Sequence, residues 1–121
     1  MRADAEWHAA NGLKLSSHRP ALPGGGPQTI AELLERWVRE RPDAPALVGR
    51  RGRYSYRELD AAVTTAAAAM HELGLRAPDR IAACLPNDVD IVIAFLASQR
   101  LGLVWVGVNR PLAAPEKEYI L

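Results

Sequence analysis

The stretch from Arg80 to Asn109 reads RIAACLPNDVDIVIAFLASQRLGLVWVGVN, with two apolar runs separated by a segment of helix length. The runs at 81–85 and 103–106 lack polar alternation, which is typical of strands covered on both faces of a parallel sheet. Segment 88–101 is long enough for the crossover that parallel strands need. Residues 80–108 are therefore predicted to form a right-handed βαβ unit.

A hairpin and a capped helix are predicted directly before this unit. Two short runs, ALV and RY, flank the turn GRRG at 49–52, which is typical of a β-hairpin. Ser55 and Glu58 then form a capping box, and a one-sided apolar pattern continues to Gly74. We expect a helix between the hairpin and this glycine.

A further helix is predicted at the start of the ordered region. Thr29 and Glu32 match the capping-box pattern, and apolar residues follow at helical spacing until Pro42. This favours a single amphipathic helix. Residues 1–28 are rich in proline and glycine and are predicted to be an irregular arm, which leaves 29–121 as one domain.

Histidines and the single cysteine offer no obvious site. His8 and His18 lie in the irregular arm without ligand spacing, so a metal site is not expected there. Cys84 sits inside an apolar run and is predicted to be a buried, inert thiol. One cysteine also excludes a disulfide framework, which favours a reducing cytoplasm.

Composition excludes several classes of partner. Apolar residues make up 49% of 121, charged residues 24%, and the formal net charge is +1, so no nucleic-acid partner is implied. The longest glycine-free apolar stretch, 91–97, is far shorter than the roughly 20 residues of a membrane span. The charged N-terminus is unlike a secretory signal. We expect a cytoplasmic protein without a membrane span.

A candidate binding rim lies at the strand ends. Ligands of open parallel sheets bind beyond the carboxyl ends of the strands, where Asn87 follows one strand and Asn109 and Arg110 follow the other. These three residues are the candidate substrate-side rim, with Arg110 able to meet an anion. Alternatively, Asn87 or Asp88 caps the helix and Asn109 shapes a turn.

Three motifs carry a family resemblance. RYSYREL at 53–59 resembles the strand-to-helix signature of the adenylate-forming superfamily, which includes acyl-CoA synthetases, aryl ligases and nonribosomal adenylation domains. ASQRLG at 97–102, running into VWVGVN, resembles its second signature, and APEKEYIL at 114–121 resembles the helix that follows. The resemblance covers about 29–121. It implies an α/β fold: a partial N-terminal subdomain with a β-hairpin and a βαβ unit flanked by helices, and an incomplete sheet.

The resemblance also indicates what this chain lacks. Family members use ATP and Mg to activate a carboxylate as an acyl-adenylate, and then pass the acyl group to the thiol of CoA. Their phosphate loop and later catalytic motifs are absent, and PGGGP at 23–27 has no following Lys-Ser or Lys-Thr. No catalytic residue, cofactor-binding residue or metal ligand is therefore assigned. The isolated chain is expected to be an inactive ligase fragment without a cofactor of its own.

Partners and alternative functions follow from the incomplete sheet. An open edge and uncovered apolar faces favour self-association or docking onto the remainder of a ligase. One alternative function is a stand-alone α/β interaction module that uses this edge. The other is a small nucleotide or ligand binder at the strand ends.

Overall fold

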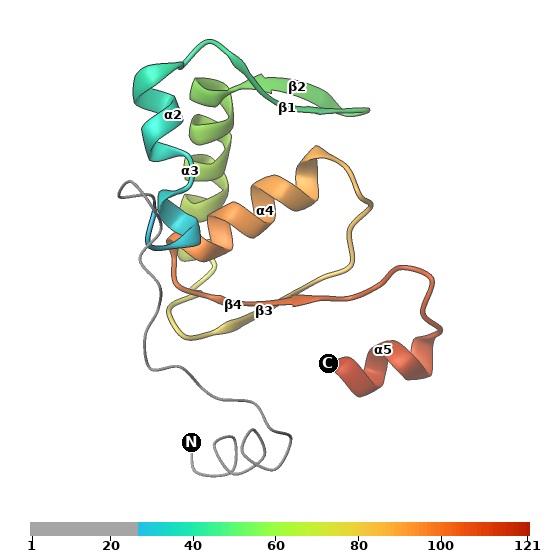
Figure 1. Cartoon of the computed structure of the whole chain (residues 1–121). Coiled ribbons are helices and arrows are strands. Elements are labelled where there is room, and N and C mark those ends of the chain that lie inside the picture. Colours follow the sequence, from blue (N-terminus) through green and yellow to red (C-terminus); the bar gives the residue numbers. More distant parts are fainter. Residues whose placement is uncertain (1–26) are drawn as a thin grey trace, which may run out of the picture.

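The computed structural model describes residues 27–121, so His8, His18 and nearly all of the predicted arm lie outside the described residues. Figure 1 shows two separate two-stranded sheets, β1–β2 and β3–β4, with helices beside them. This is the expected α/β class with an incomplete sheet. The elements are η1 (Ile30–Glu32), α2 (Glu35–Glu40), β1 (Pro45–Gly49), β2 (Gly52–Ser55), α3 (Tyr56–Glu72), β3 (Arg80–Ala83), α4 (Val89–Arg100), β4 (Val104–Gly107) and α5 (Ala114–Ile120).

The βαβ unit forms as predicted, but its sheet is covered on one face only. Strands β3 and β4 pair in parallel, and α4 connects them. The Trp105 ring meets the Phe95 ring of α4 edge-on, with 5.6 Å between centroids. Because side chains alternate across a strand, Val104 points to the opposite face, where 45% of it is exposed. The parallel sheet therefore has one uncovered face within the described residues, as the expected incomplete sheet implies.

The predicted hairpin and its capped helix are confirmed. β1 and β2 pair antiparallel across the Arg50–Arg51 turn. Ser55 Oγ accepts from the Glu58 amide at 3.3 Å, and Glu58 Oε2 accepts from the Ser55 amide at 2.8 Å. Gly74, with φ of 93°, adopts the left-handed conformation that closes α3.

The main core lies between α3 and α4. The two helices approach closely because small side chains meet there: Ala97 is fully buried and Ala67 nearly so. At the edge of this contact the Arg100 guanidinium donates to Thr64 Oγ1 at 2.7 Å and to the Asp60 carboxylate. The buried residues of this core are Leu34, Leu59, Val63, Ala67 and Ala97.

The helix predicted from Thr29 is broken into two short pieces, η1 and α2. The Thr29 side chain makes no capping hydrogen bond. Glu32 instead accepts from the Gln28 amide at 2.8 Å, and its own amide donates to Thr29 O three residues earlier. Such tight i→i+3 turns form 3-10 helix, so regular α-helix begins only at α2. The predicted end before Pro42 is confirmed.

Candidate functional site

The candidate rim residues do not all line one described cavity. A cavity of about 280 Å³ lies between the hairpin and the start of α4, and Asn87 lines it. Asn109 and Arg110 are exposed and are not among its lining residues. The Asn109 carbonyl accepts from the Leu112 amide at 3.3 Å, which closes a turn as the alternative interpretation expected. The cavity is lined by Leu47, Val48, Gly49, Arg50, Asn87, Asp88, Val89 and Val92.

Asp88, rather than Asn87, is the N-cap of α4. Its Oδ1 accepts from the Val89 amide at 2.8 Å and from the Arg51 amide of the hairpin turn at 3.4 Å. The Val89 hydrogen bond above all, and then those from Arg51 and Arg50, hold the pKa of Asp88 below its ordinary value. This carboxylate is therefore ionised at neutral pH and joins two elements.

The amino end of α4 does not suit a phosphate. A helix N-terminus normally favours anions, but Asp88 already places a carboxylate on this one. Asp90 lies in the first turn and pairs with Arg51, with 3.0 Å between Oδ2 and Nε. A nucleotide phosphate would meet two carboxylates here, so the residues present do not fit the phosphates of AMP or ATP.

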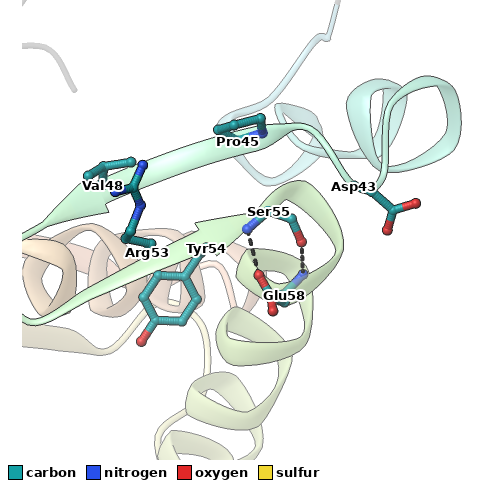
Figure 2. Close-up of a pocket in the computed structure, with 7 residues that line it drawn as sticks. All are labelled: Asp43, Pro45, Val48, Arg53, Tyr54, Ser55 and Glu58. Carbon is teal, nitrogen blue, oxygen red and sulfur yellow. Dashed lines mark hydrogen bonds between the residues drawn. The ribbon is translucent and has the colours of Figure 1, made fainter.

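A second hollow, of about 220 Å³, lies between the hairpin and the start of α3 (Figure 2). Its Ser55 and Glu58 bond to each other, as the dashed lines show. The Ser55 amide, followed by its hydroxyl, keeps the pKa of Glu58 below its ordinary value. The pair caps a helix and supplies no activated nucleophile or base. The lining residues are Asp43, Pro45, Val48, Arg53, Tyr54, Ser55 and Glu58.

The open face of β3–β4 carries an apolar hollow. It has a volume of about 330 Å³, and Ile120 and Leu121 from the end of the chain line it together with Ala82 and Val106. Ile120 is 40% exposed and Leu121 is 78% exposed. Arg80 is the only charged residue among those lining it. The hollow is therefore a surface for apolar contact rather than a site for chemistry.

Cys84 is exposed, so the prediction of a buried thiol is wrong. Ala83, the last residue of β3, is buried, and the chain leaves the sheet immediately after it. The apolar run at 81–85 thus extends two residues beyond the end of β3 at Ala83. Within residues 27–121 no group of three or more His, Cys, Asp or Glu side chains is placed to hold a metal ion. No helix of this part is long and apolar enough to cross a membrane.

Sequence reasoning missed the contact between the hairpin and α4. A Cβ at Gly49 would overlap Asp88 Oδ1 and lie 2.8 Å from Val89 Cγ1, so a larger residue there would force the hairpin or these side chains to shift. Arg51 and Asp88 are 37 residues apart. No local motif signals such a contact. The glycine at position 49, beside the turn, was the only sequence feature that could have suggested a close approach at this point.

Comparison with known proteins places the chain in a family. The model of the family described as AMP-binding enzyme matches residues 34–121. A methyl-dioxo-octahydro-indenyl propanoyl:CoA ligase of Mycobacterium tuberculosis is 38% identical over 94 residues, which are 78% of this chain and 18% of that protein. The long-chain-fatty-acid–CoA ligase FadD13 of the same organism is 31% identical over 77% of this chain and 17% of its own length.

Solved structures agree with the sequence comparison. A Mycobacterium tuberculosis fatty acyl CoA synthetase superposes with a TM-score of 0.73 at 32% identity, over 77% of this chain and 19% of that one. An anthranilate CoA ligase, AuaEII, superposes with a TM-score of 0.73 at 27% identity, over 77% of this chain. The chain thus spans less than a fifth of the length of these relatives. It belongs to the family of AMP-binding, adenylate-forming enzymes and corresponds to the N-terminal portion of their fold.

Proposed function

We propose that this chain is the scaffold-forming N-terminal part of an ATP-dependent acid:CoA ligase and has no ligase activity alone. The match to CoA ligases over residues 34–121 carries this proposal. In the whole enzyme, ATP and Mg would activate a carboxylate as an acyl-adenylate, and CoA would take the acyl group. Two observations support inactivity. The carboxylates of Asp88 and Asp90 at the amino end of α4 oppose a phosphate. Ser55 and Glu58 hydrogen-bond to each other and supply no nucleophile or base.

The test is ATP–pyrophosphate exchange by the purified 121-residue chain with a panel of aliphatic and aromatic acids. A full-length relative, the long-chain-fatty-acid–CoA ligase, is the positive control. We expect exchange no faster than in a blank without protein. Acid-dependent exchange above that blank would refute the inactive-fragment proposal.

We propose that the partner of this chain is the remainder of such a ligase, docked on the open face of β3–β4. We also propose that the protein is located in the cytoplasm. Parallel sheets occur almost only with both faces covered. Here Val104, Ile120 and Leu121 remain substantially exposed on or beside the open face. Self-association of the chain through the same surface is the alternative, and it would also serve a stand-alone interaction module.

A small nucleotide binder at the strand ends is the weaker alternative. The carboxylates of Asp88 and Asp90 oppose a phosphate at the amino end of α4. Titration calorimetry of the chain with ATP, AMP and CoA distinguishes a nucleotide binder from an inactive ligase scaffold. We expect no saturable heat, whereas a saturable signal with AMP would favour the nucleotide binder.

A further inference from the structure

We propose that Asp88 is a latch that holds the tip of the β1–β2 hairpin closed over the cavity beside Asn87. The hairpin forms one wall of this cavity, and the amino end of α4 forms the other. If the tip moves away, the cavity opens. The latch concerns the movement of the hairpin and does not depend on the reaction proposed above.

The base of the hairpin is fixed independently of its tip. The Tyr56 amide donates to Ala44 O at 3.1 Å, and the Arg57 amide donates to Pro42 O at 2.9 Å. These backbone hydrogen bonds join the hairpin base to the first turn of α3. Ala46, Leu47 and Tyr54 also pack against the core, so a movement of the hairpin is confined to its tip at 49–52.

The tip, in contrast, is held by side chains of α4. Asp88 Oδ1 accepts from the Arg51 amide, and the Arg51 side chain pairs with Asp90. The ion pair is solvent-exposed, with 67% of the Arg51 side chain and 40% of the Asp90 side chain accessible, and exposed pairs contribute little. Asp88 Oδ1 is fixed by the Val89 amide of its own helix, and the Arg51 amide, at 3.4 Å and also exposed, ties the tip to this fixed oxygen.

The shape of the contact agrees with a latch. A Cβ at Gly49 would overlap the same Asp88 oxygen that accepts from Arg51. The hairpin tip therefore rests directly on the Asp88 carboxylate, without room for a further carbon atom. Gly49→Ala should separate the tip from the Asp88 carboxylate, because either the hairpin or this side chain must shift.

The experiment measures the backbone order of residues 49–52 by ¹⁵N relaxation in the full chain. Asp88→Ser keeps an N-cap for α4 but is too short to reach the hairpin. We expect the order parameters of the tip to fall from about 0.85 in the parent chain to below about 0.6 in Asp88→Ser and in Gly49→Ala, with those of α3 unchanged. Asp88→Asn, which keeps an acceptor oxygen, should restore the rigid tip.

The matched control is Asp90→Asn, which removes the ion pair but keeps the latch, and it should leave the tip rigid. A rigid tip in Asp88→Ser and Gly49→Ala would overturn the proposal. An equal loss of order in the tip and throughout α3 in both variants would also overturn it, because the tip would then not move independently of α3.

Discussion

Three acidic side chains accept a hydrogen bond from the backbone amide three residues earlier. Glu58 accepts from Ser55, Asp79 from Arg76 at 2.7 Å and Glu116 from Ala113 at 2.7 Å. Amides at helix starts and turns have no partner in the regular backbone pattern, so these carboxylates satisfy them locally. Single residues thus set where α3 and α5 begin.

The Ser55 cap gives a prediction for a single side chain. Ser55→Ala should lower the free energy of unfolding by about 1 kcal/mol, because the Glu58 amide loses its acceptor. Thr65→Ala is the control: Thr65 is exposed on the same helix, and its hydroxyl bonds only to the Ala61 carbonyl. Urea unfolding followed by circular dichroism measures both. Equal losses in the two variants would contradict a specific role for the cap.

Acid should weaken the fold through the carboxylates of Asp88 and Glu58. The pKa of Asp88 lies below its ordinary value of 3.8, chiefly because of the Val89 amide, and that of Glu58 lies below 4.5 because of the Ser55 amide. The folded chain therefore binds these protons more weakly than the unfolded chain does. Their contribution is fully present above the ordinary values and is lost as the pH falls through the lower folded-state values.

We therefore expect stability against urea to be nearly constant from about pH 7 to pH 5 and to fall below about pH 4. The charged groups around Asp88 are Arg50 and Arg51 of the hairpin and Asp90 of α4. Asp88→Asn should make the loss of stability below about pH 4 less steep than in the parent chain. An equally steep loss would exclude Asp88 as a contributor to the acid sensitivity.

At the scale of elements, α3 and α4 are joined by apolar packing and by one polar group. Arg100 reaches across from α4 to Thr64 and Asp60 of α3. The Arg100 side chain is 23% exposed and that of Asp60 is 37% exposed, so water screens this pair less than a fully exposed one. The pair should therefore help to fix how the two helices sit against each other.

A double-mutant cycle tests this role. Arg100→Met and Asp60→Asn, singly and together, should give a coupling energy of about 1 kcal/mol in urea unfolding. The matched control is the Arg36–Glu40 pair within α2, whose side chains are 63% and 47% exposed and whose coupling should be about 0.3 kcal/mol. A coupling no larger than that of the control would show that the bridge between α3 and α4 adds nothing.

The elements that could be predicted from sequence are those that local signals define. The Ser55–Glu58 box, the closing glycine Gly74 and the apolar strands all mark structure within a few residues. At the Thr29 box the Thr29 side chain makes no capping hydrogen bond, and the Gln28 amide donates to the Glu32 carboxylate. The contact of Gly49 with Asp88 joins distant parts of the chain, and no short pattern encodes it.

The candidate rim was only partly predictable for the same reason. Its location was predicted from the general rule that ligands of parallel sheets bind beyond the carboxyl ends of the strands. This rule does not say which other elements lie beside those strand ends. The structure sets Asn87 against the hairpin, an element that the rule does not include. The exposure of Cys84 depends on where β3 stops, and an apolar run does not reveal this boundary.

At the scale of the molecule, the two small sheets differ in how well they are covered. The hairpin packs against α3, whereas β3–β4 has α4 on one face and an apolar hollow on the other. Exposed apolar patches of this kind mark interaction surfaces. Among residues 27–121, the open face of β3–β4 is therefore the surface on which we propose that another layer docks.

Association through this face is testable with a charge. Val104→Lys should reduce concentration-dependent association in sedimentation velocity and lower the fluorescence of a bound apolar dye, because Val104 is 45% exposed on the open face. Leu73→Lys is the control, since Leu73 is 82% exposed at the end of α3 and does not line the hollow. A parent chain that stays monomeric and binds no dye would contradict the surface proposed here.

The exposed Cys84 makes the strand-end region convenient to label. It is the only cysteine in the sequence, and it follows β3 by one residue, beside the loop that leads to Asn87. A maleimide fluorophore or a nitroxide spin label will therefore attach at one known position without prior mutagenesis. Its emission or line shape then reports from this rim whenever a ligand, a hairpin movement or another polypeptide alters the surroundings.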